Sequence, residues 1–170
     1  ALLACNGRWI GSTDSAAMRM LPFMVLRDHS LTFDSVIPPT IDTKTLPYWF
    51  VVSGGHVLSR FPVATALLAT PFYAPAVLSG APMTVENLEA LERIAAASLT
   101  ALMSLLVWRV LRQTLAWRPA LFVLFAFVFA TPVVNVLGKS LWQHTGGALA
   151  AAFALYGLFS PQRSAVQRAL

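Results

Sequence analysis

Three long runs of apolar residues in the second half of the chain predict helices that cross a membrane. They cover about residues 94–110, 119–137 and 141–159. Each run is close to the roughly 20 residues that a helix needs to cross about 30 Å of hydrocarbon. Arg109 marks the end of the first run. Pro119 opens the second, where a proline fits because the first N–H of a helix has no intrahelical partner.

A fourth apolar run, residues 62–78, has enough hydropathy to span but contains the three prolines Pro62, Pro71 and Pro75. Prolines break or kink a helix, so they favour a helix that lies in the membrane interface or dips partway in. The basic loop 109–118 and the C-terminal tail then share one side and the acidic segment 86–92 lies on the other, as the positive-inside rule requires. If the run spans instead, residues 6–60 move to the cytoplasm, and the charge pattern allows this too.

The first half of the chain is its least apolar part. Residues 1–5 are interpreted as the end of a truncated first transmembrane helix. The same residues contain a string similar to a lipoprotein cleavage box, without the basic leader that should precede it. Residues 6–92 are predicted to be an extracytoplasmic loop with juxtamembrane helices. Residues 93–170 are predicted to hold the three spans and a cytoplasmic tail.

Two local structures are predicted inside this loop. Residues 18–27 have the pattern of a short helix, for which Asp14 or Ser15 is a suitable N-cap. Residues 48–59 contain two strand-forming segments around a Gly-Gly pair, the pattern of a β-hairpin. The loop is therefore expected to be folded and not extended.

Composition supports lipid as the main solvent. Of the 170 residues, 57% are hydrophobic and 11% are charged, whereas soluble domains carry about 25% charge. A net charge of +5 could indicate nucleic acid, but the basic residues are sparse and flank apolar runs instead of forming a patch. The predicted fold class is thus a mainly α, polytopic membrane protein, with membrane lipid and not nucleic acid as its partner. The single cysteine, Cys5, allows no internal disulfide.

Asp14 and Arg19 lie five residues apart at the predicted junction between loop and helix. An aspartate just outside a membrane can take a proton from an acceptor hydroxyl, and an arginine can bind a phosphate through two parallel hydrogen bonds. In the alternative, Asp14 caps the helix and Arg19 reaches lipid headgroups. Spacing alone favours that alternative.

Further polar side chains are expected on the same membrane face. His56 and Arg60 flank the end of the hairpin, and Lys139 and His144 lie between the second and third spans, beside Trp142. His56 and Arg60 could bind an anionic headgroup or a pyrophosphate, and Lys139 and His144 could hold a phosphate. Ordinary roles at a membrane surface also explain them, and Trp142 is a typical interfacial anchor.

The remaining acidic residues suggest less chemistry. A set at helical spacing, Glu86, Glu89 and Glu92, is predicted to be the solvated start of a helix. Asp28, His29 and Asp34 are possible metal ligands, but their spacing does not match a known metal-binding motif. The chain contains no Walker loop, no cysteine-based zinc pattern and no Gly-x-Ser-x-Gly elbow.

Three segments taken together resemble the N-terminal part of GT-C-type integral membrane glycosyltransferases, relatives of the protein O-mannosyltransferases and of the aminoarabinose and arabinofuranosyl transferases. They contain the strings Gly11-Ser12-Thr13-Asp14-Ser15, Phe61-Pro62-Val63-Ala64-Thr65 and Lys139-Ser140-Leu141-Trp142-Gln143-His144. In that family the first extracytoplasmic loop carries a catalytic aspartate and a proline-opened juxtamembrane helix. Asp14 matches the aspartate, and residues 61–73 match the helix, which supports the non-spanning interpretation. The family's Asp-Glu pair is absent because Ser15 follows Asp14, so use of a divalent metal (Mg or Mn) stays open.

The resemblance implies a GT-C-like helical bundle in the cytoplasmic membrane that transfers a sugar from a polyprenyl-phosphate donor to an extracytoplasmic acceptor, by an inverting displacement. It implies Asp14 as the general base. The residues expected to stabilise the departing phosphate are Arg19, Arg60, Lys139 and His144. Further candidates for substrate binding are His56, Trp142, Gln143 and Asp34. Two alternatives stay open: a non-catalytic lipid-binding or scaffold protein of the same fold, and a transporter, which the scarcity of ionisable residues inside the spans disfavours.

Overall fold

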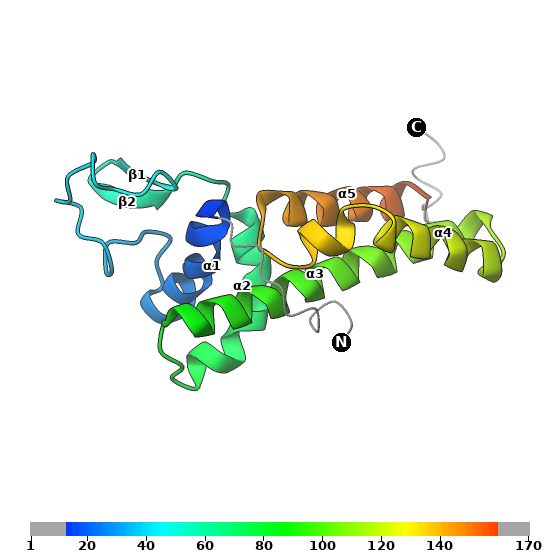
Figure 1. Cartoon of the computed structure of the whole chain (residues 1–170), viewed down its shortest axis with the longest axis horizontal. Coiled ribbons are helices and arrows are strands. Elements are labelled where there is room, and N and C mark those ends of the chain that lie inside the picture. The colour runs from blue at the N-terminus through cyan, green and yellow to red at the C-terminus, as the bar shows by residue number, and fades with distance from the viewer. Residues whose placement is uncertain (1–12, 160–170) are drawn as a thin grey trace, which may run out of the picture.

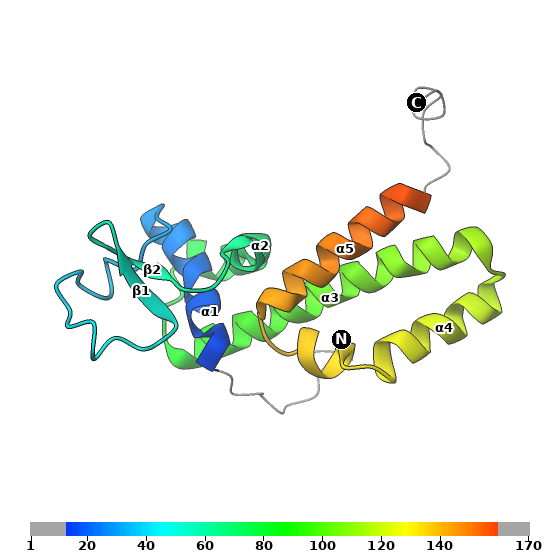
Figure 2. The same cartoon turned by 90° about the horizontal axis from the view of Figure 1, so that it is seen from above.

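The computed structural model describes residues 13–159, and this part of the chain is mainly helical. Its elements are η1 (Thr13–Ser15), α1 (Ala16–Phe23), η2 (Met24–Asp28), β1 (Phe50–Ser53), β2 (His56–Ser59), α2 (Ala64–Leu78), α3 (Val85–Thr114), α4 (Trp117–Phe129), η3 (Val133–Leu137) and α5 (Gln143–Phe159). Helix α3 extends along most of the molecule. The hairpin, α1 and α2 gather at its N-terminal end, and α4 and α5 flank its remainder (Figures 1 and 2). The predicted helix end at residues 1–5 and the tail beyond residue 159 lie outside the described residues.

The first helical segment confirms the helix predicted over residues 18–27. It begins as the 3₁₀ turn η1, continues as α1 and widens into the π-helical turn η2. Ser15 occupies the N-cap position of α1, but its side chain does not make the capping hydrogen bond. The segment ends at His29, whose φ of 50° is left-handed.

The predicted β-hairpin is also confirmed. Strands β1 and β2 pair antiparallel, with Phe50 opposite Ser59 and Ser53 opposite His56. Gly54 and Gly55 have φ values of +59° and +80°. Positive φ at both central residues is what a two-residue type I′ turn requires, and glycine adopts it without a steric penalty.

Helix α2 lies across the N-terminal end of α3 and packs against α1, α3 and α5 (Figure 2). Pro71 and Pro75 lie inside the helix with exposed side chains, so both prolines are accommodated within one helix. Its 15 residues correspond to about 22 Å at 1.5 Å per residue, which is less than the roughly 30 Å of a hydrocarbon core. This length agrees with the predicted helix that does not span.

Helix α3 is longer than the predicted run over residues 94–110. It begins at Val85, where the Thr84 side chain accepts a hydrogen bond from the backbone N–H of Asn87 (3.3 Å), and it ends at Thr114. The predicted boundary near residue 93 therefore falls inside a continuous helix. Residues at helical spacing turn one face of α3 into the core: Leu88, Leu91, Ala95, Leu99, Met103 and Leu106.

The prediction of one helix over residues 119–137 is wrong. Helix α4 ends at Phe129, and a separate π-helical turn, η3, follows from Val133. Pro132 lies between them; it has no N–H to donate and disfavours helical backbone in the residue before it. Thr131 places its hydroxyl on the carbonyl of Phe127, which satisfies a backbone group at the break.

Within residues 13–159, α3 is the single helix that is long and apolar enough to cross a membrane. Three were expected. The 13 residues of α4 reach about 20 Å, and α5 starts with polar residues. Large apolar side chains are nevertheless exposed on the helices, notably Leu105, Phe122, Phe125, Phe153 and Leu158. The structure is therefore mainly helical, with one helix able to cross a membrane.

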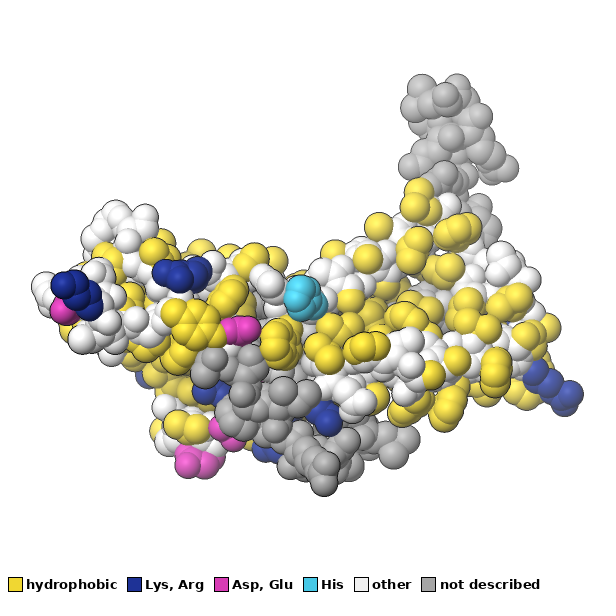
Figure 3. Space-filling model, turned by 45° about the horizontal axis from the view of Figure 1, so that its top comes forward, with side chains coloured by type: hydrophobic (Ala, Val, Ile, Leu, Met, Phe, Trp, Pro, Cys, Tyr) yellow, Lys and Arg dark blue, Asp and Glu magenta, His cyan; other side chains and the backbone are white. Residues whose placement is uncertain are grey.

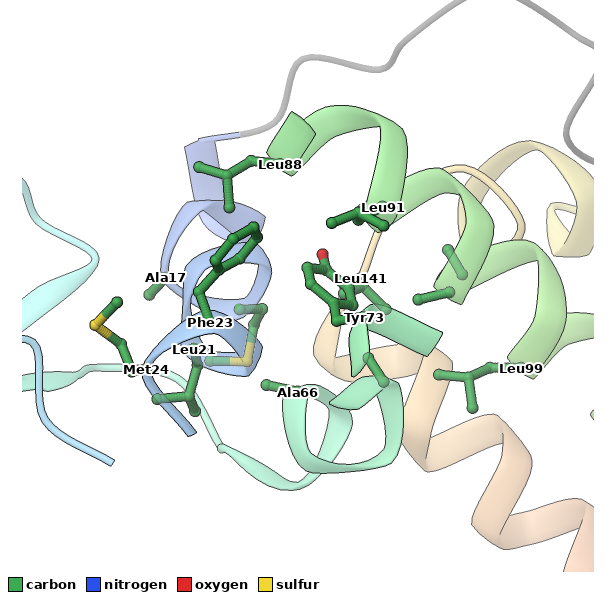
Figure 4. Close-up of a cluster of buried hydrophobic side chains, with 14 of the residues drawn as sticks. Ala17, Leu21, Phe23, Met24, Ala66, Tyr73, Leu88, Leu91, Leu99 and Leu141 are labelled. Carbon is green, nitrogen blue, oxygen red and sulfur yellow. The ribbon is translucent and has the colours of Figure 1, made fainter. Parts of the chain in front are cut away.

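The core lies where α1, α2 and α3 meet (Figure 4). The rings of Phe23 and Tyr73 pack edge to face with centroids 5.9 Å apart, and both side chains are buried. Leu91 and Leu141 approach Tyr73 from α3 and from the turn before α5. This core joins the N-terminal segment to the first residues of α5.

Candidate functional site

A pocket of about 110 Å³ lies where η1, α1, the β2–α2 connection and the start of α5 meet. The described residues that line it are Asp14, Met18, Phe61, Trp142, Gln143 and His144. Figure 3 shows an acidic side chain and a histidine close together on one face, beside the apolar helices. Four of the predicted site residues thus meet in one place, although Asp14 is separated from Trp142, Gln143 and His144 by more than 120 positions in the sequence.

Asp14 is held by Tyr48, which is not among the described residues that line the pocket. The Tyr48 hydroxyl donates a hydrogen bond to Oδ1 of the half-buried Asp14 carboxylate. Tyr48 lies immediately before β1, next to Trp49, on which its ring packs. The hairpin therefore orients the carboxylate, a role that the sequence pattern did not indicate for Tyr48.

The start of α5 is held by a carboxylate from α3. Oε1 of Glu92 accepts hydrogen bonds from the hydroxyl of Ser140 (2.5 Å) and from the backbone N–H of Leu141 (3.0 Å). Thr145 donates from its hydroxyl to the carbonyl of Ser140 (3.2 Å), which closes the same turn. Trp142 to His144 follow directly, so this turn decides where the pocket side chains lie.

Helix α2 approaches the first turn of α5 very closely. The Thr65 hydroxyl donates to the carbonyl of Gln143 (3.3 Å). A Cβ at Gly146 would lie 2.4 Å from Oγ1 of Thr65, whereas a Cβ at Gly147 would meet open space. The contact therefore requires glycine at residue 146.

Glu92 contradicts the prediction of a solvated helix start. Its side chain is 0% exposed, and its Oε2 lies 3.9 Å from Nη1 of Arg19, which is 17% exposed. Burial, and to a smaller degree the charge of Glu92, raises the pKa of the neighbouring Tyr73 hydroxyl well above its usual value. The spacing of Glu92 from Leu88 and Leu99 places it on the apolar face of α3, and this was the available signal for its burial.

The other predicted phosphate-binding residues do not line the described part of the pocket. Arg19 pairs with Glu92, Arg60 is an exposed residue after β2, and Lys139 is half-buried next to Ser140. Among residues 13–159, the lining of the pocket therefore unites one carboxylate with one imidazole and does not include Arg19, Arg60 or Lys139.

Asp34 and His56 form a separate pair beside the hairpin. Nδ1 of His56 lies 2.6 Å from Oδ2 of Asp34, and the backbone N–H of Val57 donates to Oδ1 (2.7 Å). The hydrogen bond from His56, followed by that from Val57, lowers the pKa of Asp34. The backbone N–H of Phe33 donates to the carbonyl of Val57 (2.8 Å), so Asp34 attaches the preceding loop to the edge of β2.

A divalent metal does not fit the described pocket. Asp14 and His144 are its two ligand-type side chains, whereas Mg²⁺ and related ions prefer several oxygen ligands. Across residues 13–159, no group of three or more His, Cys, Asp or Glu side chains is placed to hold a metal ion.

The arrangement suits proton transfer beside an anion. The half-buried Asp14 carboxylate is a candidate base, and His144 lies in the first turn of α5, where backbone N–H groups and the helix dipole favour negative charge. These assignments depend on the geometry alone, since comparisons with protein-family models, curated proteins and solved structures find no match to this chain.

Proposed function

We propose that the protein is an integral membrane glycosyltransferase that transfers a sugar from a polyprenyl-phosphate donor to an acceptor hydroxyl. The observation that carries the proposal is that Asp14 and His144 line one pocket. This pocket lies near the N-terminal part of α3, the helix that is long and apolar enough to cross a membrane. Its volume of about 110 Å³ is below the 300–1,000 Å³ of typical ligand sites. The pocket is thus large enough for the acceptor hydroxyl and the sugar–phosphate bond of the donor, and the remainder of the donor lies outside it.

In the proposed reaction Asp14 accepts the proton of the acceptor hydroxyl while the hydroxyl oxygen attacks the anomeric carbon. The bond from this carbon to the donor phosphate breaks, and its electron pair stays on the phosphate. The Tyr48 hydroxyl holds the Asp14 carboxylate in place. His144 and the first turn of α5 face the phosphate, where they stabilise its developing charge.

The structure changes which basic residues enter this proposal. Arg19 is engaged with the buried Glu92, so it supports the fold instead of the leaving group. Arg60 and Lys139 are left out because neither is among the described residues lining the pocket.

In the proposed membrane placement α3 crosses the bilayer and α2 lies in the outer interface. Helix α2 lies across α3 and is too short to span. The exposed apolar residues of α4 and α5 face lipid or further helices of a multi-pass bundle in the cytoplasmic membrane. Residues up to about Glu92, with the pocket, are then extracytoplasmic.

The test is sugar transfer by the protein in proteoliposomes that contain polyprenyl-phosphate sugars. Asp14→Asn is expected to lower kcat by about 10²–10⁴-fold, because a positioned base contributes this much. Asp42→Asn, in an exposed loop, is the matched control. Unchanged transfer in Asp14→Asn would remove Asp14 as the base. Lipid binding without any transfer by the unaltered protein would favour the non-catalytic alternative.

A further inference from the structure

The turn between α3 and α4 lies at the end of the molecule opposite the hairpin (Figure 1), and basic side chains are visible at that end (Figure 3). The sequence of this turn contains arginines and tryptophans. We call it the basic tip, and its residues are Trp108, Arg109, Arg112, Trp117 and Arg118. All three arginines are exposed.

Two of the guanidinium groups are held over indole rings. The guanidinium carbon of Arg112 lies 5.8 Å from the ring centroid of Trp108, and that of Arg118 lies 5.2 Å from Trp117. Arg112 also donates from Nη1 to the carbonyl of Leu115 (2.7 Å). This bond caps the end of α3. A guanidinium has five N–H donors, so the group has donors beyond the one that this bond uses.

Nothing in the nearby sequence neutralises this charge. From Arg93 to Leu170 the chain contains no Asp or Glu. All seven acidic residues precede Arg93, and the described acidic residues belong to the segment that forms the other end of the molecule. No acidic side chain of residues 93–170 therefore competes with an external anion for the basic tip.

The exposed surface next to the basic tip indicates which class of anion would bind there. On the adjoining turns of α3 and α4 large apolar side chains are exposed, namely Leu105, Leu121, Phe122 and Phe125. Moving toward the tip on α3, Leu105 is followed by Trp108 and then by Arg109 and Arg112. On α4 the apolar side chains end at Leu121, and Arg118 and Trp117 follow. On both helices an apolar band thus gives way to tryptophan and arginine at the tip. This is the order of acyl chains, interface and headgroups that a helix meets as it leaves a bilayer, whereas a nucleic-acid surface lacks the apolar band.

We propose that the basic tip binds the phosphate groups of anionic phospholipids, in the leaflet opposite the pocket. The proposal rests on the membrane placement given above but not on sugar transfer. Each Lys or Arg near an anionic surface strengthens attraction about fivefold, so three arginines give up to about a hundredfold preference for anionic over zwitterionic lipid.

The test measures which lipids stay with the protein. The full chain is placed in nanodiscs of equimolar phosphatidylglycerol and phosphatidylcholine, and bound lipids are counted by native mass spectrometry. The unaltered protein is expected to retain mainly phosphatidylglycerol. The triple variant Arg109→Gln, Arg112→Gln, Arg118→Gln is expected to lose most of this enrichment, and high salt is expected to weaken it in the unaltered protein.

A matched triple variant at the other end of the molecule loses the same net charge: Arg27→Gln, Lys44→Gln, Arg60→Gln. It is expected to keep the enrichment, and equal loss in both triple variants would overturn the proposal. Tighter binding of a single-stranded RNA than of phosphatidylglycerol at the basic tip would also overturn it. Extraction of the protein from liposomes by carbonate would refute the membrane placement itself, whereas lipid enrichment without sugar transfer would refute only the proposed activity.

Discussion

Replacement of Glu92 tests whether a buried carboxylate fastens the start of α5. Glu92→Ala removes the acceptor of the Ser140 hydroxyl and of the Leu141 N–H, and it removes the carboxylate 3.9 Å from Arg19. Glu92→Gln has nearly the same shape and keeps one acceptor oxygen, but it removes the charge and puts an amide NH2 in place of the other oxygen. The two variants therefore separate hydrogen bonding from ion pairing.

The structure indicates the size of each effect. A buried donor left without an acceptor costs about 1–3 kcal/mol, and the Leu141 N–H and the Ser140 hydroxyl are both affected by Glu92→Ala. Removing one partner of a buried ion pair costs about 3–5 kcal/mol in total. Arg19 is 17% exposed and partly hydrated, so we expect the lower half of this range for Glu92→Ala and about 1–2 kcal/mol for Glu92→Gln.

The assay is reversible unfolding of the chain in mixed micelles, followed by circular dichroism as the fraction of denaturing detergent rises. Glu89→Ala, one turn earlier in α3 and half-buried, is the control, with an expected change within about 0.5 kcal/mol. A loss below 1 kcal/mol in Glu92→Ala would refute the carboxylate clamp. An equal loss in Glu92→Gln and Glu92→Ala would refute the role given to hydrogen bonding.

Two further predictions concern local geometry. Gly146→Ala should destabilise the fold by about 1–3 kcal/mol because its Cβ would overlap Thr65, whereas Gly147→Ala, which meets open space, should be neutral or slightly stabilising in the same unfolding assay. The carboxyl of Asp34 should titrate below the ordinary value of about 3.9 in an NMR experiment. A lowered folded-state pKa stabilises the fold above about pH 4 and loses this effect as the pH falls through the folded value. A midpoint at or above 3.9, or one that His56→Ala leaves unchanged, would contradict the pair.

The pattern of residues along the chain was sufficient for the local elements. The helix around Met18 and the hairpin with its Gly54–Gly55 turn were predicted because the local spacing of apolar residues and the conformation of glycine decide them. The break between α4, which ends at Phe129, and η3 contains Pro132 and follows the same kind of local rule. The apolar run continues on both sides of this proline, so hydropathy alone predicts one uninterrupted helix.

Tertiary structure alone decided which distant residues meet. The sequence placed Asp14, Trp142, Gln143 and His144 among the candidates, and packing of α1, α2 and α5 brought them to one pocket. The same packing leaves Arg60 exposed and outside the described lining of the pocket. The position of a residue in the sequence does not determine the direction in which its side chain points from the surface.

Glu92 shows the physical reason most clearly. Charge predicts exposure, because an isolated carboxylate loses hydration on burial. Partners supplied by Arg19, Ser140 and Leu141, from three different parts of the chain, replace that hydration. The sequence determined that Glu92 lies on the apolar face of a helix. Only the fold determined that this face would be covered by hydrogen-bond donors and a cation that pair with the Glu92 carboxylate.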